Sequence, residues 1–222
     1  MTQSKSYTQI QVGAVLLAAG EGSRMGNIPK CLIKLDGYSL LQRQLLALTE
    51  AGVDEIVLVT GYYHSEVAQE LKILDVTSSL RVVRNEHAQE GQVTSVRLGI
   101  ETLGGDLDAV IMTLSDQPLI ESQDIKALIA AFKKRAAGEI ILPMFNGQRG
   151  NPIILSGSVM KTILASGKEM VCRNFMDQHP ELVNQWQTQN DHYVVDIDTP
   201  KDLELLSAQK GWTFSLPNSD KA

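Results

Sequence analysis

Short apolar segments alternate with amphipathic ones along the first 143 residues. Parallel neighbouring strands need a crossover between them, and helices usually supply it. The alternation therefore predicts an α/β fold, a three-layer αβα, Rossmann-like arrangement with a mostly parallel sheet in a single domain. The strand-like segments, rich in Val, Ile and Leu, are residues 12–19, 54–61, 80–85, 107–118 and 139–143. The segments with apolar residues at helical spacing are residues 39–52, 64–74, 92–104 and 122–136.

The pattern changes after residue 144. We expect helices at residues 158–165 and 199–208, an extended segment at 191–198, and a strand that returns to the same sheet. The predicted domain covers residues 8–210, and residues 211–222 are predicted to form a C-terminal tail. Residues 215–222 of this tail are expected to be frayed.

A glycine-rich loop, "LAAGEGSRMGNIPK", follows the first predicted strand. Such loops commonly hold phosphate on backbone N–H groups. It is not a Walker A loop, because Gly26 is followed by Asn27 rather than lysine. Gly20, Gly22 and Gly26 also give a spacing one residue too long for the dinucleotide fingerprint. A tight turn whose glycines only permit positive φ remains the alternative.

Arg24 and Lys30 favour the phosphate-binding interpretation, because they place two positive charges in this loop. Asp116 follows the predicted strand 107–118 in the dipeptide Ser115-Asp116. Ligands of open α/β sheets bind at the carboxyl ends of strands, so the loop and Asp116 are expected to share one crevice.

The loop resembles the signature of GT-A-like nucleotidyltransferases, the MobA-like NTP transferase family. Further segments match that family in order, and the combination of "SDQP", "RGNP" and "DIDTP" is similar to its molybdenum cofactor cytidylyltransferase branch. The resemblance implies a GT-A-like fold and an Mg²⁺-dependent transfer of a nucleoside monophosphate from an NTP to a phosphorylated acceptor, with release of pyrophosphate. The matching segments are residues 17–30, 84–100, 114–120, 145–156 and 196–206.

The resemblance assigns the metal to carboxylates. It makes Asp116 and Asp198 the Mg²⁺ ligands, with Asp196 in reserve. On an extended segment Asp196 and Asp198 would face the same side. Asp116 could instead open the Asp-Gln-Pro turn, and Asp198 could cap the helix that starts near Pro200.

The resemblance also implies the nucleotide contacts. Arg24 and Lys30 are the expected catalytic residues, because they would neutralise the triphosphate and the leaving pyrophosphate. The "LAAG" sequence resembles cytidine-preferring members, which favours CTP over GTP. The expected nucleotide-binding residues are Leu17, Ala18, Ala19, Gly20, Gly22, Ser23, Gly61, Asn85 and Ser95.

Gly150, Asn151 and Arg173 are the expected acceptor-binding residues, and a molybdopterin-type cofactor is the implied acceptor. The chain departs from the branch on this side. Ser115 stands where the family usually has Gly before the Asp, and Asn151 replaces a His. Most of a "G-D-x-G-A-R" element is also replaced at residues 166–174, where Arg173 remains.

Composition excludes several other classes of protein. The net charge of −6 argues against a general nucleic-acid binder, and no apolar stretch is long enough to cross a membrane. The N-terminal residues show no secretory signal, and two lone cysteines, Cys31 and Cys172, fit a cytoplasmic protein. Cys31 is expected to be a core residue, and the four histidines, which lack metal-ligand spacing, to be surface or capping residues.

Three alternatives to a cytidylyltransferase stay open. The enzyme could use GTP, or it could use a sugar phosphate as acceptor. The chain could also be a non-catalytic chaperone that delivers a cofactor to a partner molybdenum hydroxylase. The presence of Arg24, Lys30, Asp116 and Asp198 together disfavours the last alternative, because a pure binder does not need the carboxylate pair.

Overall fold

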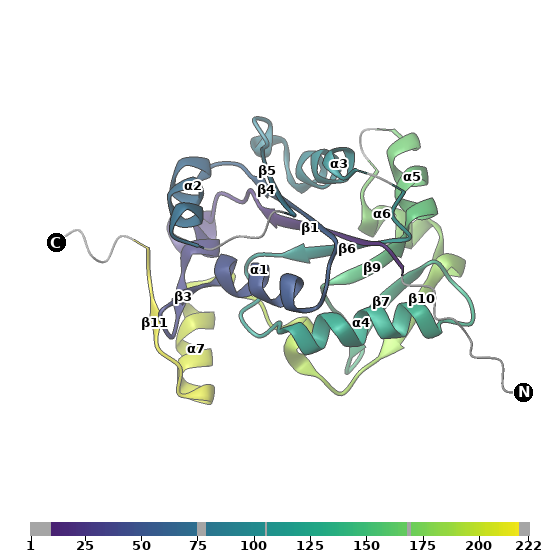
Figure 1. The fold of residues 1–222 in the computed structure, drawn as a ribbon. Helices are drawn as coiled ribbons and strands as arrows, with labels where there is room; N and C mark the ends of the chain where they lie inside the picture. The colour runs from purple at the N-terminus through teal and green to yellow at the C-terminus, as the bar shows by residue number, and fades with distance from the viewer. Residues whose placement is uncertain (1–9, 75–78, 105, 168–169, 218–222) are drawn as a thin grey trace, which may run out of the picture.

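A twisted eight-stranded sheet runs through the centre of the protein in the computed structural model, which describes residues 10–74, 79–104, 106–167 and 170–217 (Figure 1). The strand order is β10-β7-β9-β6-β1-β4-β5, with β8 paired to β7. β9 pairs antiparallel with β6 and β7, whereas β1, β4, β5 and β6 are parallel neighbours. The strands are β1 Val12–Ala18, β4 Glu55–Thr60, β5 Leu80–Arg84, β6 Ala109–Leu114, β7 Ile140–Phe145, β8 Gln148–Arg149, β9 Ile153–Ser156 and β10 Val183–Gln187.

Helices cover both faces of this sheet, as the alternating sequence predicts (Figure 1). α1, α2 and α4 pack on one face, and α3, α5 and α6 pack on the other. The helices are α1 Leu40–Glu50, α2 His64–Ile73, α3 Gln92–Thr102, α4 Ser122–Lys134, α5 Gly157–Ala165, α6 Cys172–Gln178 and α7 Pro200–Lys210. The predicted single-domain, three-layer α/β fold is confirmed.

Side chains of β1 alternate between two apolar cores. Ala14 and Leu16 belong to the core under α1 and α4, whereas Val15 and Leu17 belong to the core under α3. Successive side chains of a strand point to opposite faces, so a strand buried on both sides needs a continuous apolar run. This explains why β1 has no polar residue along its length.

A third, smaller core lies at the end of the molecule that carries α7 (Figure 1). A three-stranded sheet, β11-β2-β3, borders it, with β2 Lys34–Leu35, β3 Tyr38–Ser39 and β11 Phe214–Ser215. Trp212 and Phe214 pack against this core. The predicted tail therefore begins too early, because these two aromatic side chains gain burial and β11 pairs with β2.

Some predicted elements differ in the structure. Residues Asp191–Val194 form a 3-10 turn, η5, within the segment predicted to be extended, because Asn190 caps them through its side chain. β6 is shorter than predicted and ends at Leu114, so Asp116 lies in a turn beyond the strand. The predicted domain start at residue 8 and the last residues of the predicted tail, 218–222, lie outside the described residues.

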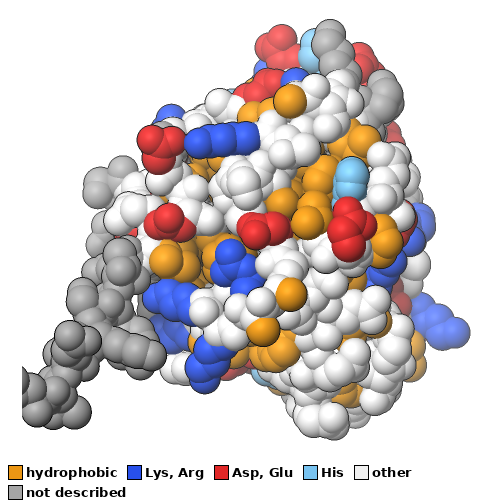
Figure 2. Space-filling view, turned by 90° about the vertical axis from the view of Figure 1, so that its right-hand side faces the viewer, with side chains coloured by type: hydrophobic (Ala, Val, Ile, Leu, Met, Phe, Trp, Pro, Cys, Tyr) orange, Lys and Arg blue, Asp and Glu red, His pale blue; other side chains and the backbone are white. Residues whose placement is uncertain are grey.

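Figure 2 shows the face of the molecule that carries α5, α6 and β10. Acidic and basic side chains both occur across this face, with hydrophobic side chains visible between them. This face therefore has no single charge sign. In the part of the chain that the structure describes, no helix has the length and apolar character needed to span a membrane.

Candidate active site

The glycine-rich loop leaves β1 in a left-handed turn that only glycine fits well. Gly22 has a φ of 68°, and a Cβ there would lie 2.1 Å from the carbonyl oxygen of Ile28. The loop then forms two 3-10 turns, η1 Ser23–Met25 and η2 Lys30–Leu32. Met25 is buried in the third core and anchors the loop, whereas Gly20, Ser23 and Arg24 are exposed. The loop thus presents its backbone and Arg24 to solvent from a fixed base.

Lys30 lies between two carboxylates that are distant in sequence. Its Nζ lies 2.6 Å from Asp116 Oδ2 and 2.8 Å from Asp198 Oδ1. The side chains of Lys30 and Asp116 are each 19% exposed, and that of Asp198 is 29% exposed. Arg24 Nη1 lies 2.9 Å from the second oxygen, Asp198 Oδ2. The structure therefore brings the four predicted residues Arg24, Lys30, Asp116 and Asp198 together in one cluster.

Backbone contacts fix the two carboxylates beside each other. Ile197, which is fully buried, donates its N–H to the carbonyl oxygen of Asp116 at 3.0 Å. Thr199 is the N-cap of α7, and its capping box with Asp202 also takes up the N–H of Asp198. The alternative that Asp198 caps α7 is therefore wrong, and its carboxylate is left to face Lys30.

Electrostatics in the cluster follow from this crowding. Burial alone would lower the pKa of Lys30, but the charges and hydrogen bonds of Asp116 and Asp198 raise it overall, so the ammonium stays charged. Asp196 lies apart from the ion pairs and is exposed. Partial loss of hydration and the negative charges of Asp116 and Asp198 raise its pKa.

The carboxylate pair offers oxygens suited to a divalent cation. Asp116 Oδ1 is buried and has no hydrogen-bond partner, although a charged oxygen normally has one. The other three oxygens of the pair face the cations of Lys30 and Arg24. Within the described ranges no group of three or more His, Cys, Asp or Glu residues is arranged to hold a metal ion. Two carboxylates alone match magnesium, which usually combines one or two carboxylates with substrate phosphates.

The other predicted nucleotide-binding residues lie around the same edge of the sheet. Leu17, Ala18 and Ala19 are buried at the end of β1, so only their backbone is available to a ligand. The N–H of Ser115 already donates to the carbonyl oxygen of Leu17. At Gly61 a Cβ would lie 2.6 Å from the carbonyl oxygen of Ala19, so this glycine allows the close approach of two strand ends.

Asn85 and Ser95 are bonded to each other rather than exposed. Asn85 Nδ2 donates to Thr94 Oγ1 and Ser95 Oγ, both at 2.8 Å, and its Oδ1 accepts the N–H of His87. Both side chains are buried. Asn85 therefore shapes the loop between β5 and α3, beside an open cavity of about 650 Å³ lined in part by Arg84, His87 and Arg97.

The predicted acceptor residues lie on the other side of β6. Gly150 packs against Tyr193, where a Cβ would lie 2.7 Å from the tyrosine Cβ. Asn151 donates its N–H to the carbonyl oxygen of Tyr193 at 2.8 Å. Arg173 is exposed on α6, whose Asp177 pairs with Arg149 beside the Gly150 loop.

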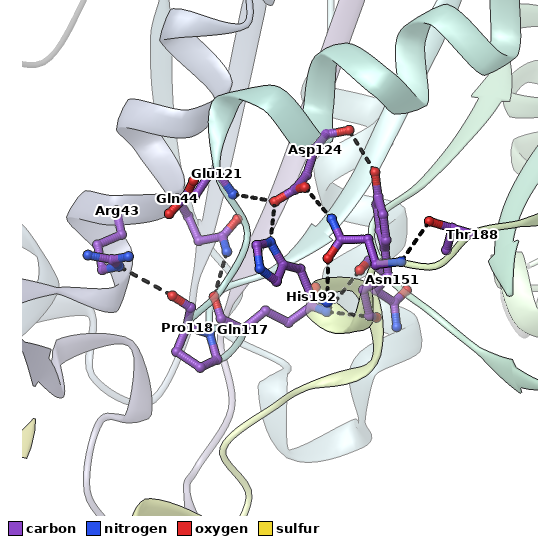
Figure 3. Close-up of polar contacts among 11 residues, drawn as sticks. Arg43, Gln44, Gln117, Pro118, Glu121, Asp124, Asn151, Thr188 and His192 are labelled. Atoms are coloured by element: carbon purple, nitrogen blue, oxygen red, sulfur yellow. Dashed lines mark hydrogen bonds and ion pairs between the residues drawn. The ribbon is translucent and has the colours of Figure 1, made fainter. Parts of the chain in front are cut away.

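A buried polar network behind the carboxylates was not predicted from the sequence. Gln117 Nε2 donates to the carbonyl oxygens of Asn151 and Tyr193, and Gln44 of α1 donates to the carbonyl oxygen of Gln117 (Figure 3). Gln117 thus joins the turn after β6 to the Gly150 loop and to the segment that leads to Asp198. Gln117 lies inside the Asp-Gln-Pro turn, and nothing in the local sequence indicates these distant partners.

Asp124 anchors the same segment from α4. Its carboxylate accepts from Asn190 Nδ2 at 2.6 Å and lies 2.9 Å from His192 Nδ1, and its carbonyl oxygen accepts from the hydroxyl of Tyr193 (Figure 3). His192 was predicted to be a surface or capping residue. It instead pairs with a carboxylate that is 8% exposed.

We expect Asp124→Asn to lower the free energy of unfolding by roughly 1.5 kcal/mol, because it keeps the shape but removes charge-assisted bonds to Asn190 and His192. For a chain of this size the melting temperature should fall by about 3–6 °C. Asp191→Asn is the matched control, since its side chain lies outside this network. Equal thermal melting of the two variants would contradict the anchoring role.

The two cysteines are structural. Burial raises the pKa of Cys31 and of Cys172 to about 12, so both thiols are protonated at neutral pH and unsuited to nucleophilic attack. Cys31 follows Lys30 but belongs to the core under α1, as predicted.

The sequence matches the MobA-like NTP transferase domain over residues 14–183. The chain belongs to the MobA-like NTP transferase family. Among curated proteins, bifunctional protein GlmU from Streptomyces coelicolor is 37% identical over 118 residues, which are 52% of this chain and 24% of that protein. The chain therefore matches only about a quarter of the length of such relatives.

Solved structures share the family fold along almost the whole chain. Rv0371c from Mycobacterium tuberculosis H37Rv aligns with a TM-score of 0.73 at 23% identity, over 90% of this chain and 99% of that one. The 4-diphosphocytidyl-2C-methyl-D-erythritol synthase from Anaerococcus prevotii aligns with a TM-score of 0.70 at 16% identity, over 91% and 96%. At these identities the likeness establishes the fold.

Proposed function

We propose that this protein is an Mg²⁺-dependent nucleotidyltransferase that transfers CMP from CTP to a phosphorylated acceptor of the molybdopterin type. The observation that carries the proposal is the cluster of Arg24, Lys30, Asp116 and Asp198 beside the glycine-rich loop. In the reaction an oxygen of the acceptor's phosphate forms a bond to the α-phosphorus of the NTP. The bond from that phosphorus to the bridging oxygen breaks, and the pyrophosphate leaves with the electron pair.

Arg24 and Lys30 supply the positive charge that this reaction requires. A guanidinium can hold two phosphate oxygens, and an ammonium adds a mobile point charge. Lys30 would bind the triphosphate and offset the charge that develops on the leaving pyrophosphate. No protein nucleophile is needed, which agrees with the two buried, protonated thiols. The exposed Gly20 and Ser23 and the half-buried Gly22 would add backbone N–H groups to the phosphate site.

Asp116 and Asp198 would hold the magnesium ion, with Asp196 in reserve. The unpartnered buried oxygen of Asp116 fits such a ligand. A bound Mg²⁺ would act as a Lewis acid toward the phosphate oxygens. One crystal structure of Rv0371c, 22% identical to this chain, is a complex with manganese, which supports a divalent cation as the metal of the proposed reaction.

The "LAAG" sequence at residues 17–20, which resembles that of cytidine-preferring members of the family, supports the choice of CTP. The backbone of Leu17, Ala18 and Ala19 would meet the base, with the loops of Gly61 and Asn85–Ser95 near the base or ribose. A neighbour in fold, a CMP:2-keto-3-deoxy-manno-octonic acid synthetase, is described in complex with CTP and has a TM-score of 0.66 at 16% identity.

Gly150, Asn151 and Arg173 would meet the acceptor. The molybdopterin-type acceptor rests on the resemblance of the Gly150 loop, and Asn151 is its weakest match. We place the activity in the cytoplasm, with a molybdoenzyme as the partner that would receive the product.

Nucleotide preference is testable by thermal melting. We expect CTP with Mg²⁺ to raise the melting temperature more than GTP with Mg²⁺ does. Ligand at 100 times its Kd adds about 2.7 kcal/mol to stability. That gain corresponds to roughly 5–10 °C for a chain of this size. UTP and ATP complete the comparison, and equal or greater stabilisation by GTP would contradict the cytidine assignment.

The whole function is tested by pyrophosphate release from each NTP, with molybdopterin and a panel of sugar phosphates as acceptors. We expect release to require both CTP and molybdopterin. If pyrophosphate is released with a sugar phosphate but not with molybdopterin, the acceptor is a sugar phosphate instead. Tight binding of CTP and molybdopterin without any release would support the chaperone alternative instead.

A further inference from the structure

The cluster around Lys30 already satisfies the carboxylates that would bind the metal. Asp116 Oδ2 and Asp198 Oδ1 contact the Lys30 ammonium, and Asp198 Oδ2 contacts the Arg24 guanidinium. The fourth oxygen, Asp116 Oδ1, is enclosed. No oxygen of the pair is both free of a cationic partner and open to solvent. A divalent cation can enter only if the ammonium leaves.

The charge balance of the cluster also disfavours binding of a divalent cation to the free protein. Two carboxylates face one ammonium and one guanidinium, so the formal charges of the cluster cancel. A neutral site gives little electrostatic attraction to a free divalent cation. Two carboxylates also supply only part of the magnesium shell, and substrate phosphate oxygens usually supply further ligands. The described part of the chain offers no third protein ligand in a metal-binding arrangement.

We propose that Lys30 occupies the place of the metal in the free protein, so that the divalent cation binds only together with the nucleotide. This inference rests on the proposed function. A triphosphate offers the ammonium and the guanidinium stronger, charge-assisted bonds to several oxygens. Its arrival draws both cations away and leaves two carboxylates with a net charge of −2 for the metal.

The side chains are suited to this exchange. Lys30 has a flexible four-carbon stem, so its ammonium can move without backbone rearrangement. The side chain of Arg24 is 68% exposed and is therefore free to turn. The carboxylates are instead fixed, because the backbone bond from Ile197 to Asp116 and the capping box of α7 hold them. Coupling of this kind is reciprocal, so the metal must raise nucleotide affinity by the same factor.

The test is a titration with Mn²⁺ that is monitored by electron paramagnetic resonance. This method measures the concentration of free Mn²⁺ and needs no turnover. The wild-type protein is titrated alone and with the α,β-methylene analogue of CTP, whose blocked bond prevents transfer. We expect the analogue to tighten Mn²⁺ binding at least tenfold. Lys30→Met keeps an unbranched side chain, one heavy atom shorter, but removes the charge. This variant should bind Mn²⁺ without nucleotide at least tenfold more tightly than the wild type.

Three variants control the result. Lys34→Met removes a lysine of the neighbouring β2 and should bind Mn²⁺ as the wild type does. Asp116→Asn added to Lys30→Met should abolish the gain, which places the extra Mn²⁺ at the carboxylate pair. Lys30→Gln is the second replacement if circular dichroism shows that Lys30→Met is not folded.

The outcomes separate the two claims. Equal Mn²⁺ affinity of Lys30→Met and the wild type, both without nucleotide, would overturn the inference, as would tight binding by the wild type alone. Absence of Mn²⁺ binding in every protein, with or without the analogue, would overturn the metal-dependent function as well. Only the absence of Mn²⁺ binding in every protein affects the proposed function.

Discussion

Asp116→Asn should reduce kcat at least about a hundredfold, which corresponds to roughly 2.7 kcal/mol of activation free energy. The substitution keeps the shape of the side chain but removes the charge that would bind magnesium. Lys30 retains its bond to Asp198, so the fold should persist. The measurements are kcat and KM for CTP at saturating Mg²⁺, together with the melting temperature.

The matched control is Asp106→Asn, which removes a carboxylate near the opposite end of β6. Its side chain is 97% exposed and pairs with Lys161 at the surface. We expect kcat of this variant to equal that of the wild type. If Asp116 only opens the turn after β6, Asp116→Asn should instead lose stability and keep its activity per folded molecule. A near-normal kcat would remove Asp116 from the metal site.

Lys30→Ala should lower kcat by about a hundredfold and raise KM for CTP by a smaller factor. Removing one group that stabilises developing transition-state charge typically costs a factor of 10² to 10³ in kcat. An interaction made mainly in the transition state affects kcat more than substrate binding. The variant also leaves Asp116 and Asp198 without the ammonium between them, so its melting temperature should fall when no metal or nucleotide is present.

Lys34→Ala is the control for a general loss of positive charge and should change neither constant. If Lys30 only holds the triphosphate, KM should rise while kcat stays unchanged. That result would contradict the proposal that Lys30 stabilises the leaving pyrophosphate. The metal dependence of both constants should be measured in parallel. If high Mg²⁺ restores the kcat of Lys30→Ala, the main contribution of Lys30 is to neutralise charge in the ground state.

The layered fold could be predicted because its signals are local. The apolar run of β1 and the helical spacing in α1 and α4 each reflect burial of one element. The position of β9 could not be predicted in the same way. It pairs antiparallel with β6 and β7, although β6 is parallel to β1 and β7 is parallel to β10. Such pairing depends on contacts with other segments rather than on the sequence of β9 itself.

The members of the candidate site could be predicted from motifs, but their contacts could not. Lys30 and Asp198 lie 168 positions apart, and nothing local in either segment indicates that they pair. The same holds for Gln117, whose amide joins two loops from different parts of the chain. The alternative that Asp198 caps α7 fails for a local reason. Thr199 and Asp202 form a better capping box one residue later.

In the proposed reaction this protein transfers the α-phosphoryl group of an NTP, as part of the nucleoside monophosphate, to a phosphorylated acceptor. The direct measurement is the fate of label from CTP carrying ³²P at the α or the γ position, incubated with Mg²⁺ and molybdopterin. We predict that α-label enters the acceptor product and that γ-label appears only in pyrophosphate, at rates that fall together in Asp116→Asn. Transfer of γ-label to the acceptor, or its release as inorganic phosphate by a preparation free of pyrophosphatase, would contradict the nucleotidyltransferase assignment.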